Sequence, residues 1–166
     1  MQDSTIILTK AQINHKIRRI AYQVYESNVN EKQVIIAGIK SNGYVLAKKI
    51  KAEVEKISPI KGVLCEVEID KKRPTSPIKT SIPLSEVKNK SLLLVDDVLN
   101  SGTTLIYGVK YFLDIPLKQF KTAVLVDRNH KKFPVKVDFK GISLSTSLNE
   151  NVAVSFEKDN YAAVLE

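Results

Sequence analysis

Cysteine is nearly absent from this sequence, because Cys65 is the only one among 166 residues. A single cysteine excludes a disulfide within the chain and a cysteine-rich metal site, and it is typical of a protein from a reducing compartment. No apolar run approaches the ~20 residues that a membrane-spanning helix needs. The N-terminal stretch also lacks the basic segment and long apolar run of a secretory signal. We therefore expect a cytoplasmic protein that does not associate with a membrane.

The composition that remains is that of a globular protein with an excess of positive charge. Hydrophobic residues make up 43% of the chain, which is enough to build a core, and 166 residues is the size of one domain. We therefore expect a single domain over residues 1–166. The formal net charge of +8 favours anionic partners such as nucleotides, diphosphates or nucleic acid, without choosing among them.

Apolar residues recur at helical spacing in three segments and form short strand-like runs between them. The first helical segment begins after Thr9, which can act as an N-cap, and the others lie at 45–57 and 103–113. Apolar runs typical of strands lie at 34–37, 63–69, 92–95, 122–126, 135–139, 152–156 and 161–165. Buried strands that alternate with amphipathic helices predict an α/β fold with a mostly parallel central sheet flanked by helices.

Residues 70–90 interrupt this alternation with prolines and a cluster of positive charges. Pro74, Pro77 and Pro83 break any regular element, and the charged side chains make the segment polar. We expect a mobile excursion here that is partly a hairpin.

The most distinctive segment begins with the apolar run Leu92–Val95, which continues into Asp96 and Asp97 and then into Asn100–Thr104. In an open parallel sheet, ligands bind at the carboxyl edge, where such a strand ends. Gly102 lets the backbone approach a ligand closely, and the start of the next helix exposes unpaired N–H groups. Together with the serine and threonine hydroxyls and the helix dipole, these N–H groups predict a phosphate-binding loop.

The two aspartates narrow the ligand further, because carboxylates beside a bare phosphate would repel it. They are explained if the ligand also presents hydroxyl groups or a divalent metal, and a ribose 5-phosphate presents hydroxyls. Side chains alternate along a strand, so Asp96 and Asp97 need not be equivalent. The segment has neither the P-loop pattern nor a Rossmann glycine fingerprint. The alternative is that these acids and hydroxyls only cap a strand and a helix.

Residues Val95–Thr104 resemble the phosphoribosyl diphosphate (PRPP) signature of type I phosphoribosyltransferases. Two flanking segments, Ile36–Ala47 and Ala123–His130, resemble the family of bifunctional pyrimidine-operon attenuation regulators and uracil phosphoribosyltransferases. The likeness extends from about Ile6 to the C-terminus. It implies a type I phosphoribosyltransferase-like domain with a flexible loop and a small hood, the latter formed by residues 135–156.

The resemblance also implies a role for each candidate site residue. The ribose hydroxyls would be contacted by Asp96 and Asp97, and the 5-phosphate would be held by Asn100, Ser101, Gly102, Thr103 and Thr104. The diphosphate would be bound, through backbone groups and a non-proline cis peptide, by Lys40, Ser41, Asn42 and Gly43, for which an ordinary strand-to-helix turn is the alternative. The base would contact Val98 and backbone groups near Val152. Mg²⁺ would be held mainly by PRPP and water, with no direct protein ligand.

Two arginines join the aspartates as candidates for catalysis. Arg128 would lie near the base or the diphosphate, and the alternative is a solvated loop arginine. Arg73 lies with Lys71 and Lys72 in the segment that corresponds to the family's flexible catalytic loop. That segment is shorter here and lacks the family's Tyr-Arg-Asp-Asp element. Its positive charges could still close over the diphosphate and exclude water.

Three functions are consistent with the sequence. The first is transfer of the phosphoribosyl group from PRPP to a nucleobase, above all uracil, which gives UMP and diphosphate. The second is a nucleotide-responsive, RNA-binding regulator of pyrimidine genes on the same fold, whose lysines would contact phosphates, although a solvated basic surface explains the lysines equally well. The third is transfer to a purine base. The resemblance further implies a homo-oligomer, with PRPP, a nucleobase and RNA as candidate partners.

Overall fold

The structure, a computed structural model, describes residues 4–166. Residues 1–3, part of the N-terminal stretch considered above for a secretory signal, lie outside the described residues. The elements follow one another as β1 (Thr5–Thr9), α1 (Lys10–Glu26), β2 (Gln33–Ile39), α2 (Asn42–Ile57), β3 (Lys61–Glu68), β4 (Lys79–Thr80), α3 (Leu84–Val87), β5 (Ser91–Leu99), α4 (Thr103–Phe112), β6 (Gln119–Asp127), β7 (Phe139–Ser143), β8 (Val152–Ser155) and β9 (Ala162–Leu165). No helix within residues 4–166 is long and apolar enough to cross a bilayer.

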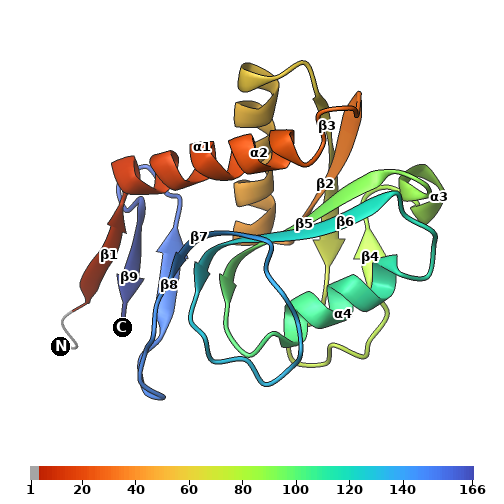
Figure 1. Cartoon of the computed structure of the whole chain (residues 1–166). Helices are drawn as coiled ribbons and strands as arrows, with labels where there is room; N and C mark the ends of the chain where they lie inside the picture. Colours follow the sequence, from red (N-terminus) through yellow and green to blue (C-terminus); the bar gives the residue numbers. More distant parts are fainter. Residues whose placement is uncertain (1–3) are drawn as a thin grey trace.

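The described residues form two sheets (Figure 1). The main sheet has six strands in the order β4-β3-β2-β5-β6-β7, and all of its neighbours are parallel except the short edge strand β4, which is antiparallel to β3. The second sheet has the order β1-β9-β8 and is antiparallel. This arrangement confirms the predicted α/β fold with a mostly parallel central sheet.

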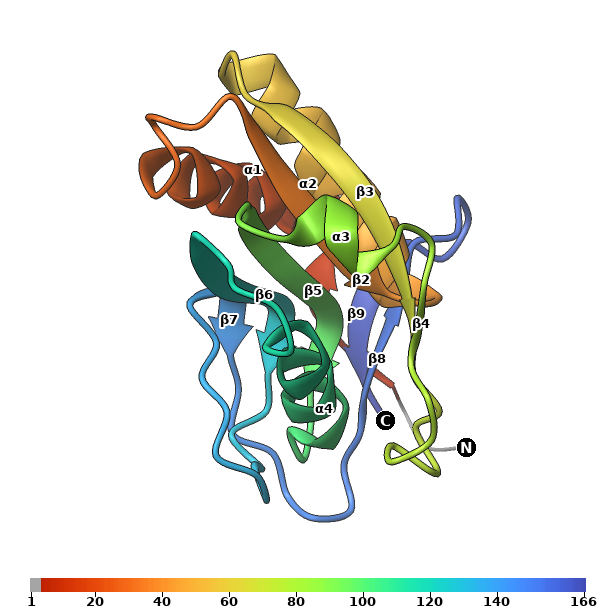
Figure 2. The ribbon, with the colours of Figure 1, turned by 90° about the vertical axis from the view of Figure 1, so that its right-hand side faces the viewer.

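The main sheet is covered on both faces, so alternate residues of its strands pack into two separate cores. Ile36 and Leu93 pack with α1 and α2 on one face, whereas Ile35 and Leu94 pack with α4 on the other. Figures 1 and 2 show these helices on opposite sides of the sheet. Burial on both faces explains why the run Leu92–Val95 is wholly apolar and does not alternate with polar residues.

Helix α1 begins at the predicted N-cap. The Thr9 hydroxyl accepts from the Gln12 N–H over 3.3 Å, and the Thr9 N–H donates to Gln12 Oε1 over 2.9 Å, which together form a capping box. The stripe of apolar residues expected to face the core is buried, as Ile13, Ile17, Ile20, Ala21 and Val24 show.

The segments that form the hood differ from those predicted. We expected residues 135–156 to form it, but β7 joins the edge of the main sheet, parallel to β6, and starts only at Phe139. Residues 135–138 form no strand, and Thr122 of β6 binds them partly through side-chain hydrogen bonds. Its hydroxyl donates to Lys136 O over 2.6 Å, and its N–H donates to Asp138 Oδ2 over 2.9 Å. The small sheet instead combines β8 with β9 and with β1, which the sequence did not reveal as a strand.

Residues 70–90 contain the predicted hairpin and one short helix. Strand β4 pairs with β3, with Val67 opposite Thr80 and Glu68 opposite Lys79, and helix α3 follows. At the start of the excursion, Asp70 Oδ1 accepts from the N–H groups of Lys72 and Arg73 over 2.9 and 3.0 Å. The Asp70 side chain therefore stabilises a turn at the start of the segment.

The carboxyl ends of β2, β5 and β6 meet at one edge of the main sheet, because the three strands are parallel neighbours. The chain leaves β2 and β5 through short turns at residues 40–41 and 100–102, and α2 and α4 begin directly afterwards. Two helix N-termini and the aspartates of β5 are thus gathered at the edge where open α/β sheets bind ligands.

Candidate active site

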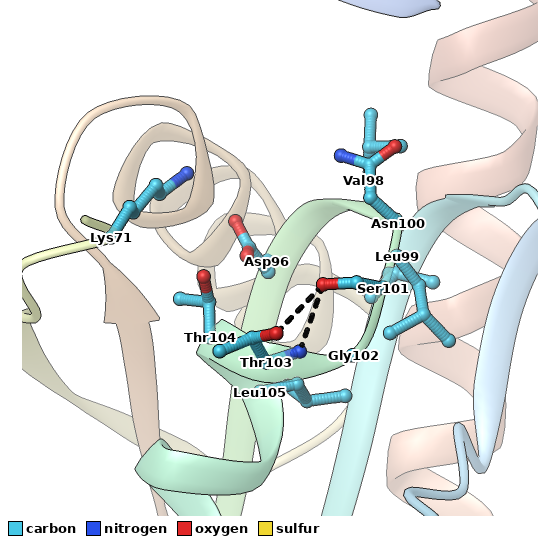
Figure 3. Close-up of a pocket in the computed structure, with 11 residues that line it drawn as sticks. Lys71, Asp96, Val98, Leu99, Asn100, Ser101, Gly102, Thr103, Thr104 and Leu105 are labelled. Carbon is cyan, nitrogen blue, oxygen red and sulfur yellow. Dashed lines mark hydrogen bonds between the residues drawn. The ribbon is translucent and has the colours of Figure 1, made fainter. Parts of the chain in front are cut away.

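A hollow opens where β5 turns into α4 (Figure 3). It is lined by Asp96, by Asn100–Thr104 and by Lys71 from the segment after β3, with Val98 at its wall. The structure therefore brings together the residues that we assigned to the 5-phosphate, and it places one of the two aspartates beside them.

The turn and the first residues of α4 present hydrogen-bonding groups to this hollow. The hydroxyls of Ser101 and Thr103 lie 2.8 Å apart, and the Thr103 N–H donates to Ser101 Oγ over 3.3 Å. The N-cap residue Gly102 has no side chain, and the first turn of α4 carries no acidic residue. The uncapped N–H groups and the positive end of the helix dipole favour an anion such as a phosphate.

Gly102 is required by the shape of this turn. Its φ of 86° lies in the left-handed region, and a Cβ there would lie 2.9 Å from Val135 Cγ1. The segment before Val135 also holds the turn from outside, since the N–H groups of Lys132 and Phe133 donate to Ser101 O over 2.7 and 3.2 Å. The turn is thus held in place by protein contacts, and such preorganisation lowers the entropic cost of binding.

Asp96 is buried at the centre of the edge, with 5% of its surface exposed. Burial and the neighbouring charge of Asp97 raise the pKa of the Asp96 carboxyl to about 8, while the Lys71 ammonium opposes this rise. Asp96 is therefore largely protonated near neutral pH and can donate a hydrogen bond. Gly43 packs directly against it, because a Cβ at position 43 would lie 3.0 Å from Asp96 Oδ1.

Asp97 is only partly buried and is fixed by two donors. Its Oδ1 accepts from the Val98 N–H over 2.9 Å, and its Oδ2 accepts from Asn42 Nδ2 over 3.3 Å. The two acids are thus not equivalent, in agreement with the alternation along a strand. Within residues 4–166, no three His, Cys, Asp or Glu side chains cluster as a metal-binding group.

Residues Lys40–Gly43 lie beside the aspartates, at the end of the neighbouring strand. Lys40 Nζ is 3.6 Å from Glu68 Oε1, and both side chains are about half exposed. Ser41 has a φ of 77° and gives α2 no side-chain cap, so the first N–H groups of this helix also lack a side-chain acceptor. The peptide bonds of residues 4–166 are all trans, so the expectation of a cis peptide here is wrong. Instead, the chain turns from β2 into α2 at Ser41, which has a positive φ.

The basic segment after β3 contributes a lysine to the site. Lys71 lines the hollow, and Figure 3 shows its ammonium group directed toward the side of the hollow where Asp96 lies. Arg73, the residue that we selected from this segment, is exposed and does not line the hollow.

Arg128 is buried, with 7% of its surface exposed, so it is not a solvated loop arginine. Its Nη1 donates to Asn100 Oδ1 over 3.0 Å, and its Nε and Nη2 donate to Thr146 Oγ1 over 3.1 and 3.0 Å. Nη2 also donates to Glu150 O. The guanidinium therefore contacts the phosphate-binding turn through Asn100, while its other donors are used by the segment that leads into β8.

Comparison with known proteins agrees with this geometry. Residues 3–159 match the family model described as the phosphoribosyl transferase domain. The chain belongs to the phosphoribosyltransferase family. The chain is 36% identical to the bifunctional protein PyrR of Geobacter sulfurreducens over 169 residues, which cover 96% of this chain and 95% of that protein. It is 32% identical to the bifunctional protein PyrR of Bacillus pumilus, with 95% and 93% covered. These relatives confirm the resemblance found in the sequence.

Solved structures share the fold of this chain. The hypoxanthine phosphoribosyltransferase of Trypanosoma cruzi superposes with a TM-score of 0.79 at 12% identity, covering 97% of this chain and 95% of that one. A hypoxanthine-guanine phosphoribosyltransferase of Bacillus anthracis gives 0.76 at 14% identity, covering 96% and 95%. At these identities the likeness shows the fold alone.

The two residues assigned to the base lie where the main sheet meets the hood. Val98 and Val152 are 8% and 9% exposed and belong to the same hydrophobic cluster. The backbone of Val152 pairs with Leu165 of β9.

Three residues that shape the site were not selected from the sequence. Lys71 was recognised only as part of a basic run, whose pattern does not show which cation points inward. Thr146 and Glu150 bind Arg128 from a distant segment. Such residue types are common in surface loops, so no local pattern distinguishes them.

Proposed function

We propose that this protein transfers the phosphoribosyl group of PRPP to a ring nitrogen of uracil and releases UMP and diphosphate. The observation that carries this proposal is an anion-binding turn at residues 100–104 beside two aspartates at the same sheet edge. An anion site alone would fit any phosphate, whereas adjacent acids fit a phosphate that is attached to a sugar. The match to the phosphoribosyl transferase domain supports the same class of reaction.

Different residues of the site bind different parts of PRPP. The turn Asn100–Thr104 holds the 5-phosphate, and Asp97, fixed by two donors, accepts from a ribose hydroxyl. The diphosphate lies against the uncapped start of α2, between Lys40 and Lys71. As the bond from ribose to diphosphate breaks, positive charge develops on the sugar ring and negative charge on the leaving group. The Asp97 carboxylate beside the sugar stabilises the positive charge, and the cations beside the diphosphate stabilise the negative charge.

Mg²⁺ enters this proposal together with PRPP. The ion would be held mainly by PRPP and water, and the Asp97 carboxylate lies beside the phosphate-binding turn. When bound, the ion neutralises charge that develops on the diphosphate. The protein's own part is to orient the ribose under the base.

Uracil is the proposed base because the sequence resembles the family of pyrimidine-operon regulators and uracil phosphoribosyltransferases, and the relatives named bifunctional protein PyrR support that choice. Val98 and the backbone around Val152 are the groups that we assign to the base. Transfer to a purine is the alternative, since the fold is shared with enzymes for hypoxanthine and guanine.

A panel of nucleobases tests this proposal. The protein is mixed with Mg²⁺, PRPP and one base at a time, and diphosphate release is followed. We expect turnover with uracil and much less with hypoxanthine, guanine or adenine. Turnover with a purine and not with uracil would show that the substrate is a purine. No turnover with any base would contradict the proposed enzymatic activity.

RNA binding is a second candidate function, favoured by the word bifunctional in the relatives' name and by the net charge of +8. A protein that neutralises several RNA phosphates releases counterions, so its affinity should fall linearly with salt on logarithmic axes. Binding of a pyrimidine-operon leader RNA, measured over a series of salt concentrations with UMP present and absent, tests this. No binding at low salt would contradict it.

A further inference from the structure

Two polar side chains connect the hood to the two parts of the site. Asn42 joins strand β8 to Asp97, and Arg128 joins the segment that leads into β8 to Asn100. In each case one partner is a residue of the proposed substrate site and the other belongs to the hood side. The inference below rests on the proposed function of that site.

Asn42 is the first residue of α2 and lies between the aspartate and the hood. Its Nδ2 donates to Val154 O over 2.7 Å and to Asp97 Oδ2 over 3.3 Å. An amide nitrogen carries two hydrogens, so one side chain can make both bonds at once. Strand β8 is the edge of the small sheet, and its backbone carbonyl at Val154 accepts from this side chain.

Arg128 makes the corresponding connection on the phosphate side. Its guanidinium binds the Asn100 side chain, the Thr146 hydroxyl and the Glu150 carbonyl, and Glu150 lies two residues before β8. His130 adds a contact of 2.6 Å between its Nε2 and Thr146 O. A planar guanidinium with several donors holds these groups in one fixed geometry, which a lysine could not do.

We propose that Asn42 and Arg128 are positioning residues that set the place of β8 over the ribose and thereby couple base binding to phosphoribosyl binding. The Asn42 side-chain amide and most N–H groups of the Arg128 guanidinium donate their hydrogen bonds to other groups of the protein. They act through Asp97 and Asn100. A base that orders β8 also orders these two residues, and a bound phosphoribosyl group orders β8 in return. This reassigns Asn42 from diphosphate binding and Arg128 from catalysis.

The first test measures the motion of β8 directly. Asn42→Ala removes both bonds, and Asn160→Ala, an exposed asparagine near β8, is the matched control. In hydrogen exchange of the ligand-free proteins, we expect the amides of residues 152–155 to exchange roughly 3- to 10-fold faster in Asn42→Ala and unchanged in the control. Equal exchange in Asn42→Ala and the unmodified protein would overturn the role of Asn42.

The second test measures coupling through two ligands that differ only in the base. The unmodified protein should bind UMP more tightly than ribose 5-phosphate, and their affinity ratio reports the contribution of the base. In Asn42→Ala this ratio should fall roughly 3- to 10-fold, mostly through UMP. A ratio that stays the same, or an equal loss for both ligands, would contradict positioning of the hood.

Arg128→Lys should weaken both ligands, because Asn100 loses its partner, and should also lower the ratio. Thr146→Val removes the hydroxyl that accepts from Arg128 but leaves Arg128 itself in place, and it should also lower the affinity ratio. This second variant tests the role of Arg128 even if Arg128→Lys folds poorly. An unchanged ratio in Thr146→Val would overturn it. If the unmodified protein binds neither UMP nor ribose 5-phosphate, the proposed function fails, and the exchange measurement still decides whether Asn42 holds β8.

Discussion

The phosphate-binding turn and the hood serve the same site, but the chain builds them in different ways. The turn lies in one continuous segment, Asp96–Thr104, in which a strand end, a left-handed glycine and a helix start set most of the geometry, although Lys132 and Phe133 also hold it from outside. The hood combines β1 with β8 and β9 from the other end of the chain and is connected to the site through Asn42 and Arg128. Local sequence thus determines which chemical group is bound, while long-range contacts position the part that we assign to the base.

The largest effect is expected within the turn's own segment, at Asp97. Asp97→Asn keeps the shape of the side chain but removes its charge beside the ribose, so kcat/KM for PRPP should fall by about 100-fold. The free energy of unfolding should change by less than about 1 kcal/mol, because the side chain is partly exposed. Steady-state diphosphate release and chemical denaturation measure the two quantities. Asp114→Asn, at the exposed far end of α4, is the control, and an unchanged rate in Asp97→Asn would refute its role.

Gly102→Ala tests whether the backbone itself forms the anion site. The new Cβ would lie 2.9 Å from Val135 Cγ1 at a φ of 86°, so the turn must shift. We expect PRPP affinity to fall by about 10-fold or more and the free energy of unfolding to fall by about 1–2 kcal/mol. Calorimetric titration and denaturation check these values. Wild-type affinity in a variant that has lost stability would show that the turn does not bind the phosphate.

Lys71 lies outside both regions and supplies the cation of the hollow. Lys71→Ala should raise the KM for PRPP by about 5- to 10-fold, since it removes a positive charge opposite the diphosphate. Lys88→Ala, at the amino-terminal end of β5 and far from the site, is the matched control. We expect a smaller effect from Arg73→Ala, because Arg73 does not line the hollow. A larger effect from Arg73→Ala than from Lys71→Ala would reverse this assignment.

At Asp96 the expected effect is on the pH dependence of stability and not on binding. Its pKa is raised to about 8 in the folded protein, so the folded state keeps a proton that the unfolded state has released above its ordinary value near 4. The free energy of unfolding therefore decreases as pH rises between these values and levels off above about 8. Asp96→Asn removes this dependence and should gain about 1 kcal/mol or more relative to wild type between pH 5 and pH 8. Denaturation at both pH values measures it, and a constant difference would contradict the raised pKa.

The sequence predicted most of the core sheet and the turn because their signals are local. Leu92–Val95 is apolar since the strand is buried on both faces, and Thr9 begins α1 since its hydroxyl caps the helix. The strand expected at 135–139 is β7, displaced because Thr122 binds Lys136 and Asp138 through side-chain hydrogen bonds. The spacing of apolar residues in the sequence does not predict such a side-chain contact.

The same distinction applies within the site. Asn100–Thr104 could be assigned from their order in the chain, whereas the roles of Arg73 and Arg128 depended on where a loop turns and which partners a guanidinium meets. Asp70 caps the turn that leaves Lys71 at the hollow, and Thr146 and Glu150 bind Arg128 from a remote segment. Tertiary contacts, and not residue type, decide which of several similar cations faces a ligand.

The most direct test of the proposed site is a calorimetric titration of PRPP with Mg²⁺ into the ligand-free protein, its Gly102→Ala variant and its Lys88→Ala control. We predict saturable binding at one site per chain in the wild type and the control, and at least about 10-fold weaker binding in Gly102→Ala. Absence of binding in the wild type, or equal affinity in all three proteins, would contradict the assignment of residues 96–104 as the phosphoribosyl site.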